Sequence, residues 1–114
     1  MTAYKVQKMA RDIYRDIIAF RTARGQEQVP AMVSYLVDRF MKAGFSDADI
    51  RVTDYDSDGE KTQGLMVTYR AKPGSTAKPI VLLGHMDVVD ALGAPAVHPD
   101  RRRRLFLWPR HDGQ

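Results

Sequence analysis

The chain has 114 residues, with 18 Lys and Arg against 14 Asp and Glu, 44% hydrophobic residues and no cysteine. This length suits one domain or a part of a larger one. The lack of cysteine excludes disulfides, thiolate zinc ligands and a cysteine nucleophile, so any metal must be held by histidine and carboxylates. No apolar run approaches the ~20 residues that cross a bilayer, so we expect no membrane partner. The first residues contain no secretory signal, which favours the cytoplasm.

The excess of positive charge lies at the end of the chain. Residues 1–90 carry 13 basic and 12 acidic side chains, whereas residues 91–114 carry five Arg and two Asp. The body of the protein is therefore nearly neutral, and we expect no nucleic-acid partner for it.

Two helices are predicted at the start of the chain. Apolar residues recur at three- and four-residue steps from Val6 to Phe20 and predict an amphipathic helix that ends near residues 24–25. A second helix should begin around Val29 and Pro30 and end at Gly44, a good left-handed cap. Its predicted buried face consists of Val33, Leu36, Val37 and Phe40.

Three strands are predicted next. Alternating apolar residues predict strands at 49–55 and 65–69, separated by a turn at 56–59. Residues 79–84 (Pro-Ile-Val-Leu-Leu-Gly) form an apolar run with no polar face, as in a central strand covered on both sides. Two helices followed by three strands predict the opening part of a layered α/β domain. Nothing after Val89 supplies the elements that would cover that central strand.

A candidate metal site follows the apolar run. His85 and Asp87 lie two residues apart, so in extended backbone both side chains lie on one face. A carboxylate in this position can accept the second imidazole N–H and orient the ring as a metal ligand. An ordinary hydrogen-bonded histidine at a strand end gives the same spacing, so the spacing alone leaves both interpretations open.

The residues around this pair carry a resemblance to a known family. Residues 79–90 (Pro-Ile-Val-Leu-Leu-Gly-His-Met-Asp-Val-Val-Asp) resemble the first metal-binding motif of the M20 metallopeptidases, the carboxypeptidase and aminoacylase-like dizinc hydrolases. Residues 13–22 and 29–45 look like the two opening helices of that family, so the resemblance spans about residues 10–91.

The resemblance implies a fold, a cofactor and a role for each residue. The fold would be a partial three-layer α/β/α zinc-peptidase catalytic domain of the phosphorylase/hydrolase-like kind, with two helices and then three strands. His85 would bind one of two zinc ions, and Asp87 would be the catalytic-site aspartate that supports it. The resemblance also implies a peptide or an acylated amino acid as the substrate. In such a site the zinc pair would activate a water molecule and polarise the amide carbonyl.

Much of the family's site has no match in this sequence. The family also uses a bridging Asp in a Gly-Arg-Gly-x-x-Asp motif, a Glu-Glu pair that includes the general base, a further acidic ligand and a distant His. Of the residues in the family's metal site, only His85 and Asp87 can be placed in this sequence. We therefore expect little or no hydrolysis from this chain alone, and self-association through its uncovered apolar core.

The resemblance stops at residue 91, which divides the chain into residues 1–91 and an irregular basic tail at 92–114. A change of reading frame near residues 91–94 would account for this tail. Read one nucleotide later, one choice of codons for residues 104–114 encodes Gly-Tyr-Phe-Tyr-Gly-Arg-Gly-Thr-Met-Asp, which resembles the family's second motif. Part of this result is forced, since Trp108-Pro109 must be TGG CCN and gives glycine in the shifted frame.

Other functions remain open from the sequence. A small non-enzymatic interaction protein would use the Arg-rich tail to bind an acidic partner, and an intact small enzyme would complete a two-metal site across a dimer. Asp54, Asp56 and Asp58 have the alternating spacing of a calcium loop, but no bidentate Glu follows at the required distance, so a solvated hairpin turn is favoured.

Overall fold

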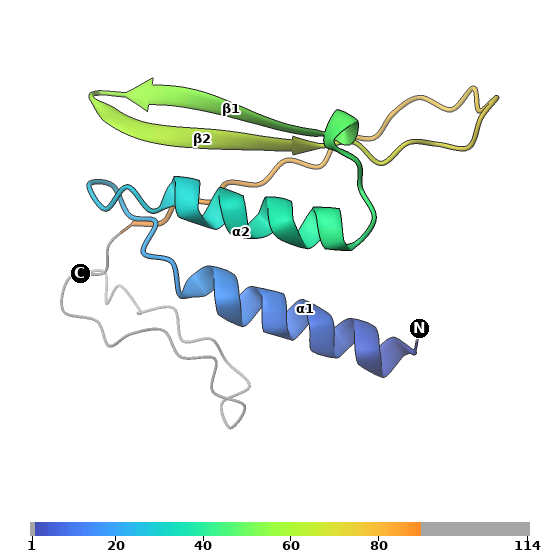
Figure 1. Ribbon diagram of the computed structural model, residues 1–114, viewed down its shortest axis with the longest axis horizontal. Coiled ribbons are helices and arrows are strands. Elements are labelled where there is room, and N and C mark those ends of the chain that lie inside the picture. The colour runs from blue at the N-terminus through green and yellow to red at the C-terminus, as the bar shows by residue number, and fades with distance from the viewer. Residues whose placement is uncertain (1, 90–114) are drawn as a thin grey trace, which may run out of the picture. The chain divides into compact units, whose positions relative to one another are not determined.

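The computed structural model describes residues 2–89, in two parts, residues 2–19 and Phe20–Val89, which are taken in turn. The first part holds helix α1, and the second holds helix α2 and strands β1 and β2 (Figure 1). The described chain is thus a small mixed α/β protein with two helices and a two-stranded antiparallel sheet. The predicted tail at 92–114 lies outside the described residues.

Helix α1 (Ala3–Ile18) begins after Thr2, whose hydroxyl accepts the Lys5 N–H at 3.3 Å. This contact satisfies one of the free N–H groups of the first turn. The predicted end near residues 24–25 was wrong, because the helix ends at Ile18. Ala23 instead forms a parallel β-bridge with Val88, and helical backbone cannot make such a bridge.

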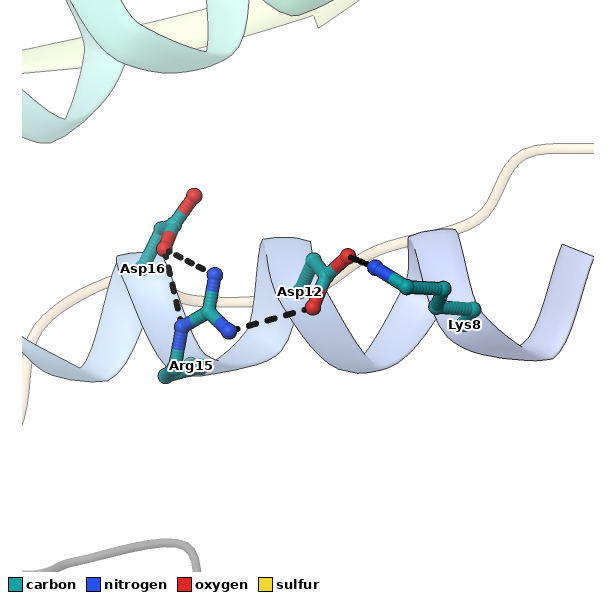
Figure 2. Close-up of polar contacts among 4 residues, drawn as sticks. All are labelled: Lys8, Asp12, Arg15 and Asp16. Carbon is teal, nitrogen blue, oxygen red and sulfur yellow. Dashed lines mark hydrogen bonds and ion pairs between the residues drawn. The ribbon is translucent and has the colours of Figure 1, made fainter. Parts of the chain in front are cut away.

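Charged side chains on α1 pair with near neighbours (Figure 2). The Lys8 ammonium lies 2.7 Å from Asp12, and Arg15 lies 3.1 Å from Asp12 and 3.2 Å from Asp16. The hydrogen bond from Lys8 is the largest cause that lowers the pKa of the Asp12 carboxyl below its ordinary value. The hydrogen bond to Asp16 raises the pKa of the Arg15 guanidinium. The Lys8–Asp12 and Asp12–Arg15 pairs favour helical backbone, because side chains four and three residues apart are neighbours on a helix surface.

Helix α2 (Val29–Lys42) has the predicted boundaries to within two residues. It ends in a Schellman motif, in which Gly44 N–H bonds to Met41 C=O and Phe45 N–H bonds to Phe40 C=O. Gly44 has φ 102°, the left-handed conformation that glycine adopts without strain. The Phe40 and Phe45 rings meet edge to face at 5.3 Å and close the motif with an apolar contact.

The apolar core of the described residues is small. Met32 and Val33 of α2 are buried, and Val33 is 1% exposed, which confirms the prediction for that residue. Leu36, Val37 and Phe40, also predicted to be buried, are half-buried. Helix α2 packs against β2, so one face of the sheet is covered (Figure 1).

Strands β1 (Ile50–Ser57) and β2 (Glu60–Val67) form a hairpin that follows the short 3₁₀-helix η1 (Asp47–Asp49). The two-residue loop is Asp58-Gly59, and both residues have positive φ, 52° and 83°. This geometry matches the right-handed twist of the strands, and Asp-Gly is a preferred sequence for it. β2 begins earlier than predicted, because the tight loop pairs Ser57 directly with Glu60.

The prediction of a third, buried central strand was wrong for the described chain. Residues 79–84, called the apolar segment below, form no strand. The side chains of Ile80, Val81, Leu82 and Leu83 are all at least 74% exposed. A strand needs a neighbour for its N–H and C=O groups, and β1 and β2 pair only with each other.

None of the helices within residues 2–89 has the length and apolar character needed to cross a bilayer.

Candidate metal-binding site

The apolar segment leads directly into the predicted site residues. His85 and Asp87 lie on irregular extended chain, with side chains 85% and 74% exposed. The chain here runs back to the loop between α1 and α2 (orange in Figure 1), where Val88 bridges Ala23. The site therefore lies at the surface of the described chain and is open to solvent on the imidazole side.

The imidazole of His85 is oriented by Asp87. Its Nδ1 lies 2.8 Å from the backbone carbonyl oxygen of Asp87 and 3.4 Å from the Asp87 carboxylate. A carbonyl oxygen only accepts hydrogen bonds, so this contact requires the proton on Nδ1. In a neutral imidazole with its proton on Nδ1, the other nitrogen, Nε2, carries the lone pair that can bind a metal. The sequence predicted that the carboxylate would hold the ring, whereas the backbone carbonyl of the same residue makes the shorter contact.

Loop residues before α2 hold this segment in place. Thr22 Oγ1 donates to the Met86 carbonyl at 2.8 Å, and Val88 N–H donates to the Thr22 carbonyl at 3.4 Å. Sequence reasoning missed Thr22. No local pattern marks it, because its partner lies 64 positions away in the chain.

These residues do not complete a zinc centre by themselves. Structural zinc sites use four protein ligands and catalytic sites use three. Within residues 2–89 there is no group of three or more His, Asp or Glu side chains placed to hold a metal ion. His85 therefore supplies one candidate ligand, and no metal-dependent step follows from the described residues alone.

The three carboxylates of the predicted acidic turn lie on the β1–β2 hairpin. Asp54 accepts from Gln63 Nε2 at 2.7 Å across the hairpin, and Asp58 pairs with Arg24 at 3.1 Å. Asp56 accepts the Gly59 N–H at 2.8 Å. Each carboxylate thus has its own partner, and the three lie on the exposed β1–β2 hairpin, in agreement with the interpretation as a solvated hairpin turn.

A shallow hollow of about 270 Å³ lies where the end of α2 meets the end of β2. Its acidic lining residue, Asp49, is 2.6 Å from the Arg70 guanidinium. That carboxylate is neutralised by Arg70, so the hollow lacks the convergent free ligands of a metal site.

Three comparisons with known proteins, against protein-family models, curated proteins and solved structures, returned no match to this chain.

Proposed function

We propose that this chain is the amino-terminal part of an M20-like zinc-dependent hydrolase that cleaves amide bonds of peptides or acylated amino acids. In this proposal His85 binds one of two zinc ions and Asp87 supports it. The observation that carries the proposal is the geometry of His85, whose Nδ1 is engaged at 2.8 Å while its ring faces solvent. An imidazole held in this way offers Nε2 as a metal ligand.

The sequence around His85 also supports the proposal. The His-x-Asp pair follows an apolar segment and precedes Val88 and Val89, as in the first metal-binding motif of that family. The remaining ligands would come from sequence that the described residues do not contain. We therefore expect the 114-residue chain alone to be inactive.

We further propose that the tail after residue 91 is read in a shifted frame. The support is the forced glycine under Trp108-Pro109, together with the family-like sequence that the shifted frame allows. Sequencing the gene tests this directly. A gene in which no shifted frame over residues 92–114 encodes the Gly-Arg-Gly-x-x-Asp motif contradicts it.

The apolar segment also supports self-association as part of this proposal. Four consecutive apolar side chains at 80–83 are each at least 74% exposed. Contiguous apolar surface of a few hundred Å² promotes association, and unpaired extended backbone adds a template for strand pairing.

The test of function uses a chain with the frame restored. That chain should bind two zinc ions and hydrolyse an acylated amino acid or dipeptide only with zinc present. His85→Ala should abolish hydrolysis and remove at least one zinc equivalent. Asp38→Asn, an exposed carboxylate on α2 paired with Lys42, is the matched control and should change neither property.

Two outcomes would overturn the proposal. One is a restored chain that folds and binds no zinc. The other is tight binding of two zinc equivalents by the 114-residue chain without added protein. A titration of that chain with nucleic acid at several salt concentrations covers the alternative, since a basic-tail interaction would weaken steeply as salt rises.

A further inference from the structure

Thr22 is the most buried polar residue among residues 2–89. It is 4% exposed, beside Ala23 at 2%, although both lie in the loop between α1 and α2. A buried hydroxyl without a partner is costly. The Thr22 hydroxyl has one, because it donates to the Met86 carbonyl at 2.8 Å.

Thr22 holds the same segment a second time through its backbone. Its carbonyl accepts the Val88 N–H at 3.4 Å, and the neighbouring Ala23 forms the parallel bridge to Val88. The two bonds reach Met86 and Val88, the residues on either side of Asp87. Asp87 is therefore fixed from both sides by a single residue.

The position of Asp87 in turn sets the His85 ring. His85 Nδ1 bonds to the carbonyl of Asp87 at 2.8 Å, and that peptide group leads directly to the Val88 N–H. By contrast, residues 80–83 lie on the other side of His85 with their side chains largely exposed. The contacts that orient the imidazole therefore come from Thr22 and residues 86–88, and not from residues 80–83.

We propose that Thr22 is a positioning residue for the candidate metal ligand. Its hydroxyl and carbonyl hold the chain at 86–88 so that the Asp87 carbonyl keeps the proton of His85 on Nδ1 and leaves Nε2 as the ligand atom. The metal-binding part of this statement rests on the proposed function. The hydrogen-bond chain from Thr22 to His85 stands on the contacts alone.

The test compares Thr22→Val with Thr22→Ser in the 114-residue chain. Val keeps the shape and removes the donor, whereas Ser keeps the donor. Thr68→Val, at an exposed threonine beyond β2, is the control. All variants carry His98→Gln and His111→Gln, so that His85 is the sole histidine. The readouts are the tautomer of the ring, from nitrogen-15 NMR, and the exchange rate of the Val88 amide.

Thr22→Val should lower the population of the Nδ1–H tautomer and speed exchange of the Val88 amide at least tenfold. Thr22→Ser and Thr68→Val should leave both near their original values. Unchanged signals in Thr22→Val, or Thr22→Ser behaving like Thr22→Val, would overturn the proposal.

A measurement on the unsubstituted chain covers the case in which Thr22→Val does not fold. The contacts require nuclear Overhauser effects between Thr22 and residues 86–88, and their absence would also overturn the proposal. None of these readouts uses zinc. A failure of the proposed function, seen as no zinc binding by the frame-restored chain, is therefore distinguishable from a failure of the Thr22 contact.

Discussion

The β1–β2 hairpin and the apolar segment are both rich in residues that favour strands, but only the hairpin forms them. Both contain β-branched and aliphatic residues, yet the hairpin is paired from Ile50↔Val67 to Ser57↔Glu60 and the apolar segment forms no strand. The apolar segment is the more hydrophobic of the two, with four consecutive aliphatic residues at 80–83. Hydrophobicity therefore does not decide which segment becomes a strand.

The position of the partner decides it. The hairpin closes through the two-residue loop Asp58-Gly59, so each strand finds its neighbour at small entropic cost. A central strand needs neighbours on both edges and layers on both faces, and all of these are distant in sequence. The hairpin is thus stabilised by contacts that are local in sequence, whereas the apolar segment has no strand partner within residues 2–89.

The largest expected effect is on association through the apolar segment. Leu82→Lys should weaken self-association about a hundredfold, because burial of a leucine side chain contributes roughly 1.5–3 kcal/mol and a lysine blocks edge pairing. Sedimentation over a range of concentrations measures this. Ala77→Lys adds the same charge in the neighbouring exposed loop and should have little effect. An unsubstituted chain that stays monomeric at every concentration would contradict self-association through the apolar segment.

The next effect tests the packed part of the molecule. Val33→Ala should lower the free energy of unfolding by about 2 kcal/mol, because Val33 is 1% exposed and the substitution leaves a cavity on the buried face of α2. Val52→Ala, at an exposed position of β1, should cost less than about 0.5 kcal/mol. Urea unfolding followed by circular dichroism gives both values. Equal losses would mean that the hairpin and α2 do not share a core.

Gly59 and Gly84 contrast the hairpin with the apolar segment at the level of the backbone. Gly59 has φ 83°, so Gly59→Ala forces a side chain into the left-handed region and should destabilise the hairpin by about 1 kcal/mol. Gly84 ends the apolar segment, and an added Cβ there meets nothing within 4 Å. Gly84→Ala should therefore leave stability within about 0.5 kcal/mol of the original. Amide exchange of β1 and β2 reports both substitutions.

The same division explains which parts of the fold were predictable from the sequence. Helix α2 and the hairpin turn were predicted well because their signals are local, namely Pro30 in the first turn, Gly44 after the end and Asp58-Gly59 between the strands. The end of α1 was placed too late. The apolar periodicity continues to Phe20, while the bridge between Ala23 and Val88 depends on a distant segment.

Prediction of the candidate site from the sequence was limited in the same way. The sequence marked His85 and Asp87 as candidates because they follow an apolar run. It could not locate Thr22, whose contact spans 64 positions, nor show that a backbone carbonyl holds the ring more closely than the carboxylate does. Hydrogen bonds between distant residues leave no periodic signal in one sequence.

The smallest effect concerns helix α1, whose ion pairs are wholly local. Lys8 lowers the pKa of Asp12 in the helix, so the folded helix favours the charged carboxylate. The resulting stabilisation is present above the pKa of an unfolded aspartate, about 3.9, and is lost as pH falls through the lower pKa in the helix. Because Asp12 lies on the surface of a helix and is only half-buried, the loss should appear as modest fraying rather than unfolding.

Carbon-13 shifts of residues 3–18, followed from pH 6 to pH 2, measure this fraying without interference from the rest of the chain. Lys8→Gln should raise the midpoint of the Asp12 titration, because it removes the largest cause of the lowered pKa. Asp12→Asn removes the titrating group and should flatten this contribution to the profile. If Lys8→Gln leaves the midpoint unchanged, the 2.7 Å contact does not persist in solution, and the Lys8–Asp12 pair does not stabilise α1.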